Sequence, residues 1–127
     1  MSAACRLVTG RENPAMKAYL IDPVRLEVTQ VQIGDDYREI YKFIDADIFE
    51  CVQINRQGDA IYIDEEGMLK NLSQQIFFMY KGYSHPLAGK GLILGTNKAT
   101  GESREPTISL NEVIKAVSFL TPYQVQA

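Results

Sequence analysis

Residue types that carry chemistry in proteins are scarce in this chain, and each shortage argues against a class of function. The 127 residues include one histidine and two cysteines, Cys5 and Cys51. Two cysteines cannot build the disulfide framework of a small secreted domain, and with a single histidine they argue against a zinc site. No apolar stretch approaches the ~20 residues of a membrane-spanning helix, which excludes a transmembrane anchor. We therefore expect a cytoplasmic protein with no membrane contact, in which Cys51 is a small buried side chain of a strand.

The overall composition is that of an ordinary globular protein. Hydrophobic residues make up 46% and charged residues 23% of the chain, and a chain of this length can bury roughly two-thirds of its unfolded surface. We expect one domain over residues 16–122, without repeats or linkers, and a short tail at 123–127. Residues 1–15 have no periodicity, so we expect a disordered extension or a misread start ahead of Met16.

The hydrophobic periodicity predicts an α+β fold, with a mainly antiparallel sheet of five to six strands and three helices. A stripe with helical spacing runs through residues 35–45, and a second one runs through residues 71–82. Residues 76–80 taken alone could also form a strand. The predicted strands are residues 17–23, 26–33, 48–54, 60–64, 91–95 and, briefly, 107–108.

The third helix has the clearest local signals. Ser109 and Glu112 have the spacing of a capping box, and Ile108 and Val113 can form a hydrophobic staple across it. A threonine and a proline at residues 121–122 should stop the helix. Its inner face is predicted to consist of Val113, Ile114, Val117 and Leu120.

The segment HPLAGKGLILG, residues 85–95, has the glycine and lysine content of a phosphate-binding loop. Such a loop needs Gly-Lys followed by Ser or Thr, between a strand and a helix. Here Lys90 is followed by Gly91, and the glycine spacing does not fit the dinucleotide fingerprint either. We interpret Gly89 and Gly91 as a tight turn into a closely packed strand, with a weak anion contact at Lys90 as the alternative.

No catalytic motif is present. His85 has no nucleophile at a recognisable spacing, which favours a structural or solvated role. Asp64 and Glu66 could bind a divalent cation or act as acid and base, but an acidic turn after a strand is far commoner. We therefore expect no enzymatic activity, no metal and no cofactor.

Charge is distributed unevenly along the chain. Residues 35–66 carry a net charge of −7, whereas residues 67–104 carry +4 together with several aromatic side chains. Such an asymmetry can mark a binding face, although charges can equally scatter over a solvated surface. The whole-chain charge of −3 argues against non-specific binding of nucleic acid.

Three segments carry a resemblance to a known family: YLIDP at residues 19–23, IYIDEEGMLKN at 61–71, and HPLAGKGLILG followed by a polar turn. From Met16 to about residue 120, the chain resembles a domain-of-unknown-function family of small proteins encoded by bacteriophages, plasmids and bacteria. The resemblance implies a cytoplasmic domain in a mobile-element setting, and it implies no activity.

These observations favour a binding protein that contacts a host or element-encoded macromolecule, or a small anionic ligand. We expect its binding site in the cationic and aromatic segment, at Tyr80, Tyr83, His85 and Lys90. Two alternatives stay open: the acidic segment 35–66 could imitate DNA and inhibit a DNA-binding protein, or Asp64 and Glu66 could serve a metal-dependent enzyme. Exposed aromatic side chains could also form a homodimer interface.

Overall fold

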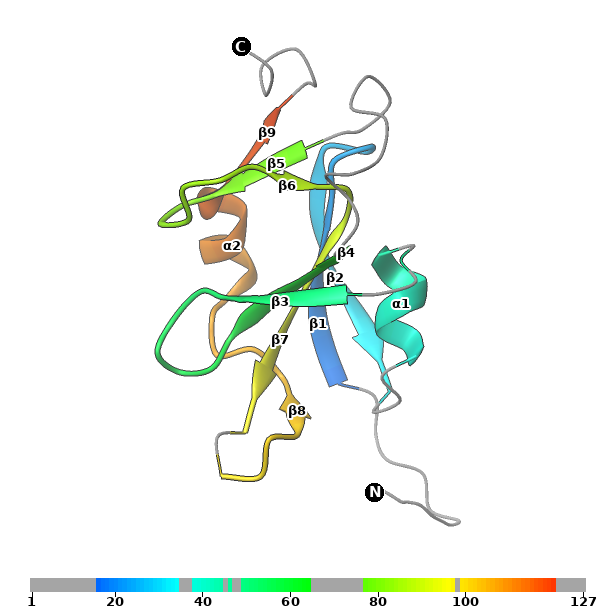
Figure 1. Cartoon of the computed structure of the whole chain (residues 1–127), viewed down its shortest axis with the longest axis vertical. Coiled ribbons are helices and arrows are strands. Elements are labelled where there is room, and N and C mark those ends of the chain that lie inside the picture. The colour runs from blue at the N-terminus through cyan, green and yellow to red at the C-terminus, as the bar shows by residue number, and fades with distance from the viewer. Residues whose placement is uncertain are drawn as a thin grey trace.

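The computed structural model describes residues 16–34, 38–44, 46, 49–64, 77–97 and 99–120, and Figure 1 shows their arrangement. The described residues contain two sheets. The larger sheet has the order β2-β1-β7-β4-β3, with the short β8 paired to β7, and the smaller sheet has the order β6-β5-β9. All strand pairs among these residues are antiparallel. The strands are β1 (Met16–Asp22), β2 (Glu27–Ile33), β3 (Phe49–Gln53), β4 (Ala60–Asp64), β5 (Phe77–Tyr80), β6 (Leu87–Ala88), β7 (Gly91–Thr96), β8 (Ser103–Arg104) and β9 (Val117–Leu120).

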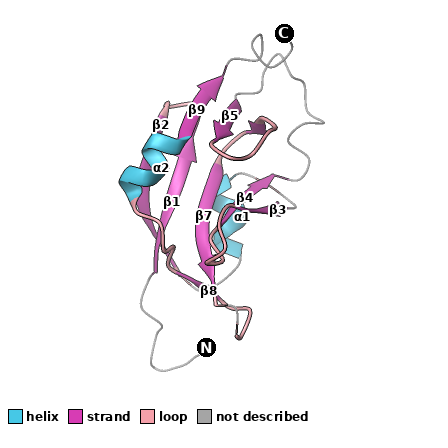
Figure 2. Ribbon diagram, turned by 90° about the vertical axis from the view of Figure 1, so that its left-hand side faces the viewer, coloured by secondary structure: helices cyan, strands magenta, loops and turns pink. Residues whose placement is uncertain are grey.

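One helix covers each face of the larger sheet, as Figure 2 shows. On one face, α1 (Arg38–Ile44) buries Ile40 and Ile44 against a cluster that includes Leu92 and Leu94 of β7. On the other face, α2 (Leu110–Ala116) and the smaller sheet cover a second cluster, which includes Val113, Phe78 and Ile93. Strand β7 lies between β1 and β4 and supplies both clusters, which explains why Gly91 to Gly95 are all buried.

Gly89 and Gly91 of the HPLAGKGLILG segment have the structural roles that were predicted for them. Gly89 has φ +78°, a conformation that only glycine adopts without strain. At Gly91, an added Cβ would lie 2.8 Å from Cζ of Phe78 and 2.9 Å from Cγ2 of Ile61. The absence of a side chain at residue 91 therefore lets the smaller sheet approach β7 closely.

The α+β character and the mainly antiparallel sheet are confirmed, but the helix count is wrong: the described residues contain two helices and nine strands. The predicted helix over residues 71–82 is overturned at its C-terminal half, where Phe77–Tyr80 form β5. Phe77 and Phe78 are both fully buried, so this strand is covered on both faces and has no alternating pattern. Residues 71–76 lie outside the described residues.

The capping box of the last helix is confirmed, whereas its predicted length is wrong. The hydroxyl of Ser109 accepts a hydrogen bond from the backbone N–H of Glu112, and the Glu112 carboxylate accepts one from the N–H of Ser109. The helix ends at Ala116, and residues 117–120 form β9, which pairs with β5. Ile114 is 48% exposed and does not belong to the inner face.

Three smaller predictions also need correction. Residues 107–108 form no strand, and β6 and β8 lie in segments that were predicted as loops. Cys51 is exposed rather than buried, because it lies on β3, an edge strand of the larger sheet. Neither described helix has the length or the apolar character to cross a membrane.

Candidate binding surface on the β1–β2 turn

The four residues that were predicted to form a binding site come from the end of β5, the loop after it and the residue before β7. Tyr80 ends β5 with its ring in the core, where burial raises its pKa, as do the nearby carboxylates of Asp59 and Glu112. Tyr83 and His85 follow in the loop after β5, with ring centroids 5.9 Å apart in an edge-on contact.

Lys90 follows β6 in the chain and directly precedes β7. Strand pairing places Gly91 opposite Ile21, and Leu92 opposite Tyr62. Continuing these registers puts Lys90 level with Asp22 and Asp64, the last residues of β1 and β4. Both carboxylates are buried, with exposures of 7% and 8%. Lys90 therefore lies at a sheet end that already supplies negative charge.

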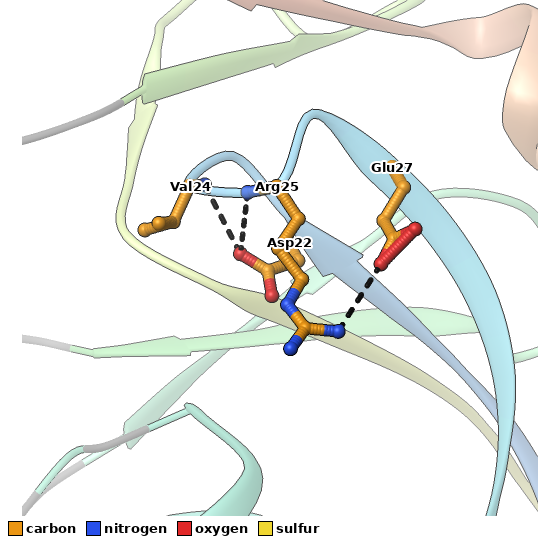
Figure 3. Close-up of polar contacts among 4 residues, drawn as sticks. All are labelled: Asp22, Val24, Arg25 and Glu27. Atoms are coloured by element: carbon orange, nitrogen blue, oxygen red, sulfur yellow. Dashed lines mark hydrogen bonds and ion pairs between the residues drawn. The ribbon is translucent and has the colours of Figure 1, made fainter.

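The turn that joins β1 to β2 lies at the same end of the sheet, and hydrogen bonds fix its shape (Figure 3). Oδ1 of Asp22 accepts hydrogen bonds from the backbone N–H groups of Val24, at 3.0 Å, and Arg25, at 3.3 Å. Pro23 is fully buried beside them. The guanidinium of Arg25 lies 3.7 Å from the carboxylate of Glu27. Because both side chains of this ion pair are well exposed, it adds little stability.

Two large apolar side chains project from this turn. Val24 is 67% exposed and Leu26 is 65% exposed, the highest values among the large hydrophobic residues described. Leu26 also has φ +57°, and no other described non-glycine residue has a positive φ. A bulky side chain in this left-handed conformation costs about 1–2 kcal/mol relative to an unstrained backbone. The turn thus combines exposed apolar surface with backbone strain, and strain of this kind is often found at functional sites.

This turn was missed in the sequence, although a signal was present. By its residue types, the segment DPVRLE predicts only the end of one strand and the start of the next. Turns of this length usually place glycine, asparagine or aspartate at the position that needs a positive φ. Two apolar residues inside a turn, with leucine in the place of glycine, are the pattern that could have identified it.

The carboxylates of the acidic segment have varied positions where the structure describes them. Asp59 and Asp64 are buried, Glu50 is exposed on β3, and Glu39 accepts a hydrogen bond from the backbone N–H of Gly34. Glu66 lies outside the described residues. Among those that are described, no three His, Cys, Asp or Glu side chains come together as a metal site.

Asp59 is a buried carboxylate with several hydrogen-bond donors around it, and its role is structural. It accepts hydrogen bonds from the backbone N–H and the hydroxyl of Thr107, from the N–H of Ile108 and from the amide of Asn55. Burial alone would raise the pKa of Asp59, but these hydrogen bonds outweigh it and hold the pKa below its ordinary value. The carboxylate ties the β3–β4 turn to the segment that leads into α2.

Comparison with known proteins gives a family without an established activity. The family model DUF3846, described as a domain of unknown function, matches residues 16–118. Neither the curated proteins nor the solved structures contain a significant match. The match covers most of the chain, including both clusters of the core and the β1–β2 turn, and the protein therefore belongs to the DUF3846 family.

Proposed function

We propose that this protein is a non-enzymatic binding protein, and that its β1–β2 turn inserts into an apolar pocket of a partner protein. The observation that supports this proposal is the pair Val24 and Leu26, each about two-thirds exposed, on a turn whose shape is fixed. We also propose that the protein acts in the cytoplasm and in a mobile-element setting, as the sequence resemblance implies.

Apolar anchors that fill a pocket supply most of the binding energy in many interfaces, and neighbouring contacts mainly exclude water. Burying the exposed two-thirds of Val24 and Leu26 would contribute about 1–2 kcal/mol for each side chain. Because Asp22 already holds the turn in one shape, little conformational entropy is lost when a partner binds. Arg25 lies between the two apolar residues, so a carboxylate at the rim of the pocket would complement the surface.

The alternative of a small anionic ligand at Lys90 has weaker support. By strand register, Lys90 is level with two buried aspartates, and their negative charge would oppose the binding of an anion. A thermal-shift panel of nucleotides separates the two possibilities. A ligand at a hundred times its dissociation constant would add about 2.7 kcal/mol of stability, and in the Lys90→Gln variant this gain would be lost.

The proposal is tested by comparing three forms of the full chain as baits in bacterial cells. The first is the wild type, the second is the Val24→Ser, Leu26→Gly double variant, and the third is Ile114→Ser. Ile114 is the matched control, because it is also a large exposed apolar residue but lies on α2. A photo-crosslinking residue at position 25 of each bait captures what touches the turn.

A partner of the turn is crosslinked by the wild type and by Ile114→Ser, and it is lost with the double variant. The purified partner should then bind the double variant at least about 30-fold more weakly, which corresponds to about 2 kcal/mol. If every crosslinked protein is captured equally by all three baits, the proposed role of the turn is wrong.

A further inference from the structure

Strand β3 is an edge of the larger sheet, and none of the described residues pairs with its outer side (Figure 1). Its sequence, FECVQ, has one charged residue and no proline, and its register with β4 is unbroken by any bulge. Monomeric proteins usually protect an edge strand with lysine, proline or a bulge. Glu50, Cys51 and Gln53 are exposed, so the described part of the chain leaves this edge accessible to a pairing strand.

The backbone groups on this edge can be assigned from one hydrogen bond. The N–H of Ile54 donates to the carbonyl of Asp59, so residue 54 directs its backbone groups toward β4. In an antiparallel pair this direction alternates with every residue. Phe49, Cys51 and Gln53 therefore direct their N–H and C=O groups outward, away from β4.

We propose that β3 pairs with β3 of a second copy of this chain, antiparallel and centred on Cys51, so that the two larger sheets become one continuous sheet. In this register Cys51 lies opposite Cys51 of the second copy, and Phe49 lies opposite Gln53 at both ends. Each of these three pairs exchanges two hydrogen bonds. All the outward-directed N–H and C=O groups of β3 then form hydrogen bonds.

Charge and hydrogen bonding distinguish this register from its neighbours. A two-fold axis at Glu50 would set two carboxylates directly opposite each other, which is destabilising. An axis at Val52 would pair Cys51 with Gln53 and leave the outward groups of Phe49 opposite the turn at Asn55. With the axis at Cys51, each Glu50 lies opposite an apolar valine and no like charges face each other. The symmetric match of the strand to itself identifies a second copy as the partner.

The first test measures the mass of the full chain in solution by light scattering and sedimentation over a range of concentrations. The wild type and Cys51→Ala should form dimers. Cys51→Pro should be a monomer, because proline removes an outward N–H without breaking a hydrogen bond to β4. Cys51→Asp, which sets two carboxylates at the centre of the pair, should also be a monomer and guards against misfolding of the proline variant. A monomeric wild type, or a Cys51→Asp variant that stays dimeric, overturns the proposal.

The second test reads the register by disulfide trapping in a Cys5→Ser background. The Cα atoms of a hydrogen-bonded antiparallel pair are about 5.5 Å apart, within the roughly 4.4–6.8 Å that a disulfide spans. Diamide is the oxidant: two thiols lose two protons and two electrons to its N=N bond, and the sulfurs join. Partial burial raises the pKa of Cys51, and a hydrogen bond with Tyr62 offsets part of this effect, so the reaction is run at about pH 9.

The matched control for trapping is the Cys51→Ala, Gln53→Cys variant in the same background. Gln53 is exposed and on the same face of β3 as Cys51. In the proposed register, the two copies of residue 53 are separated by four residues along the strands, about 13 Å. Position 51 should therefore form a covalent dimer at least tenfold faster than position 53. Equal rates at the two positions would mean random collision and would refute the register.

Discussion

The strain at Leu26 leads to a reversal of the usual effect of glycine on stability. Glycine in place of alanine normally destabilises a protein, because glycine loses more conformational freedom on folding. At position 26 the backbone has φ +57°, which glycine adopts without a steric cost and alanine does not. We expect Leu26→Gly to be more stable than Leu26→Ala.

The size of this difference follows from two opposing terms. The left-handed conformation costs about 1–2 kcal/mol for a residue with a Cβ atom, and glycine loses about 0.5–1 kcal/mol through entropy. Leu26→Gly should therefore exceed Leu26→Ala in free energy of unfolding by about 0.5–1 kcal/mol. The buried third of the leucine side chain contributes a similar amount, about 0.5–1 kcal/mol. Leu26→Ala should thus fall below the wild type, and Leu26→Gly should stay close to it.

The assay is urea denaturation followed by far-ultraviolet circular dichroism, since the chain contains no tryptophan to follow by fluorescence. Val24 supplies the matched control, because it is equally exposed but does not have a positive φ. There, Val24→Gly should be less stable than Val24→Ala by about 0.5–1 kcal/mol. If glycine is also the less stable substitution at position 26, the turn holds no strain at Leu26. If Leu26→Gly has the stability of the wild type, any loss of partner binding by this variant is due to the missing side chain and not to unfolding.

Two further predictions concern residues that hold the core together. Asp59 has a lowered pKa, so its contribution to stability is present above the pKa of the unfolded state and is lost as the pH falls through the folded pKa. Urea midpoints of the wild type should therefore fall more steeply from pH 5 to pH 3 than those of Asp59→Asn, and parallel pH profiles would refute this role. Gly91→Ala should destabilise the fold by about 1–3 kcal/mol through overpacking against Phe78. Phe78→Leu removes Cζ of Phe78, the atom nearest to the added Cβ. The Gly91→Ala, Phe78→Leu double variant should therefore lose less free energy of unfolding than the sum of the two single variants. Strictly additive losses would contradict the contact.

The strands of the larger sheet, apart from the short β8, could be predicted because their sequence signals are local. β1, β2 and β4 are bounded by turn residues, and β3 follows the same pattern, so each appears within two residues of its predicted bounds. The capping box at Ser109 is equally local, because it depends on two side chains three residues apart. Local signals of this kind predict the folded structure correctly unless a tertiary contact favours another conformation.

Tertiary contacts decided the elements that were predicted wrongly. Val117 and Leu120 continue the helical spacing of Val113, but residues 117–120 pair with β5 instead. In β5 the apolar run itself is ambiguous, because the spacing of a helix and that of a strand buried on both faces cannot be told apart over four or five apolar residues. The positive φ of Leu26 arises from the geometry of its turn. The exposure of Cys51 arises because β3 is an edge strand of the larger sheet. Neither feature can be derived from apolar spacing alone.

The two proposed surfaces, taken together, determine what kind of complex the protein can form. β3 is one edge of the larger sheet, whereas the β1–β2 turn lies at the strand ends near the other edge. In a dimer joined through β3, the two copies of the turn are separated by eight strand spacings across the sheet, roughly 38 Å at about 4.8 Å each. Because the paired β3 strands are antiparallel, the two turns also point in opposite directions. Each turn of the dimer should therefore bind a separate partner molecule, which gives a 2:2 complex. The dimer should bind the partner no more tightly than the monomeric Cys51→Asp variant does. A partner that binds the dimer much more tightly than this monomer would place the two turns side by side and would contradict the proposed pairing.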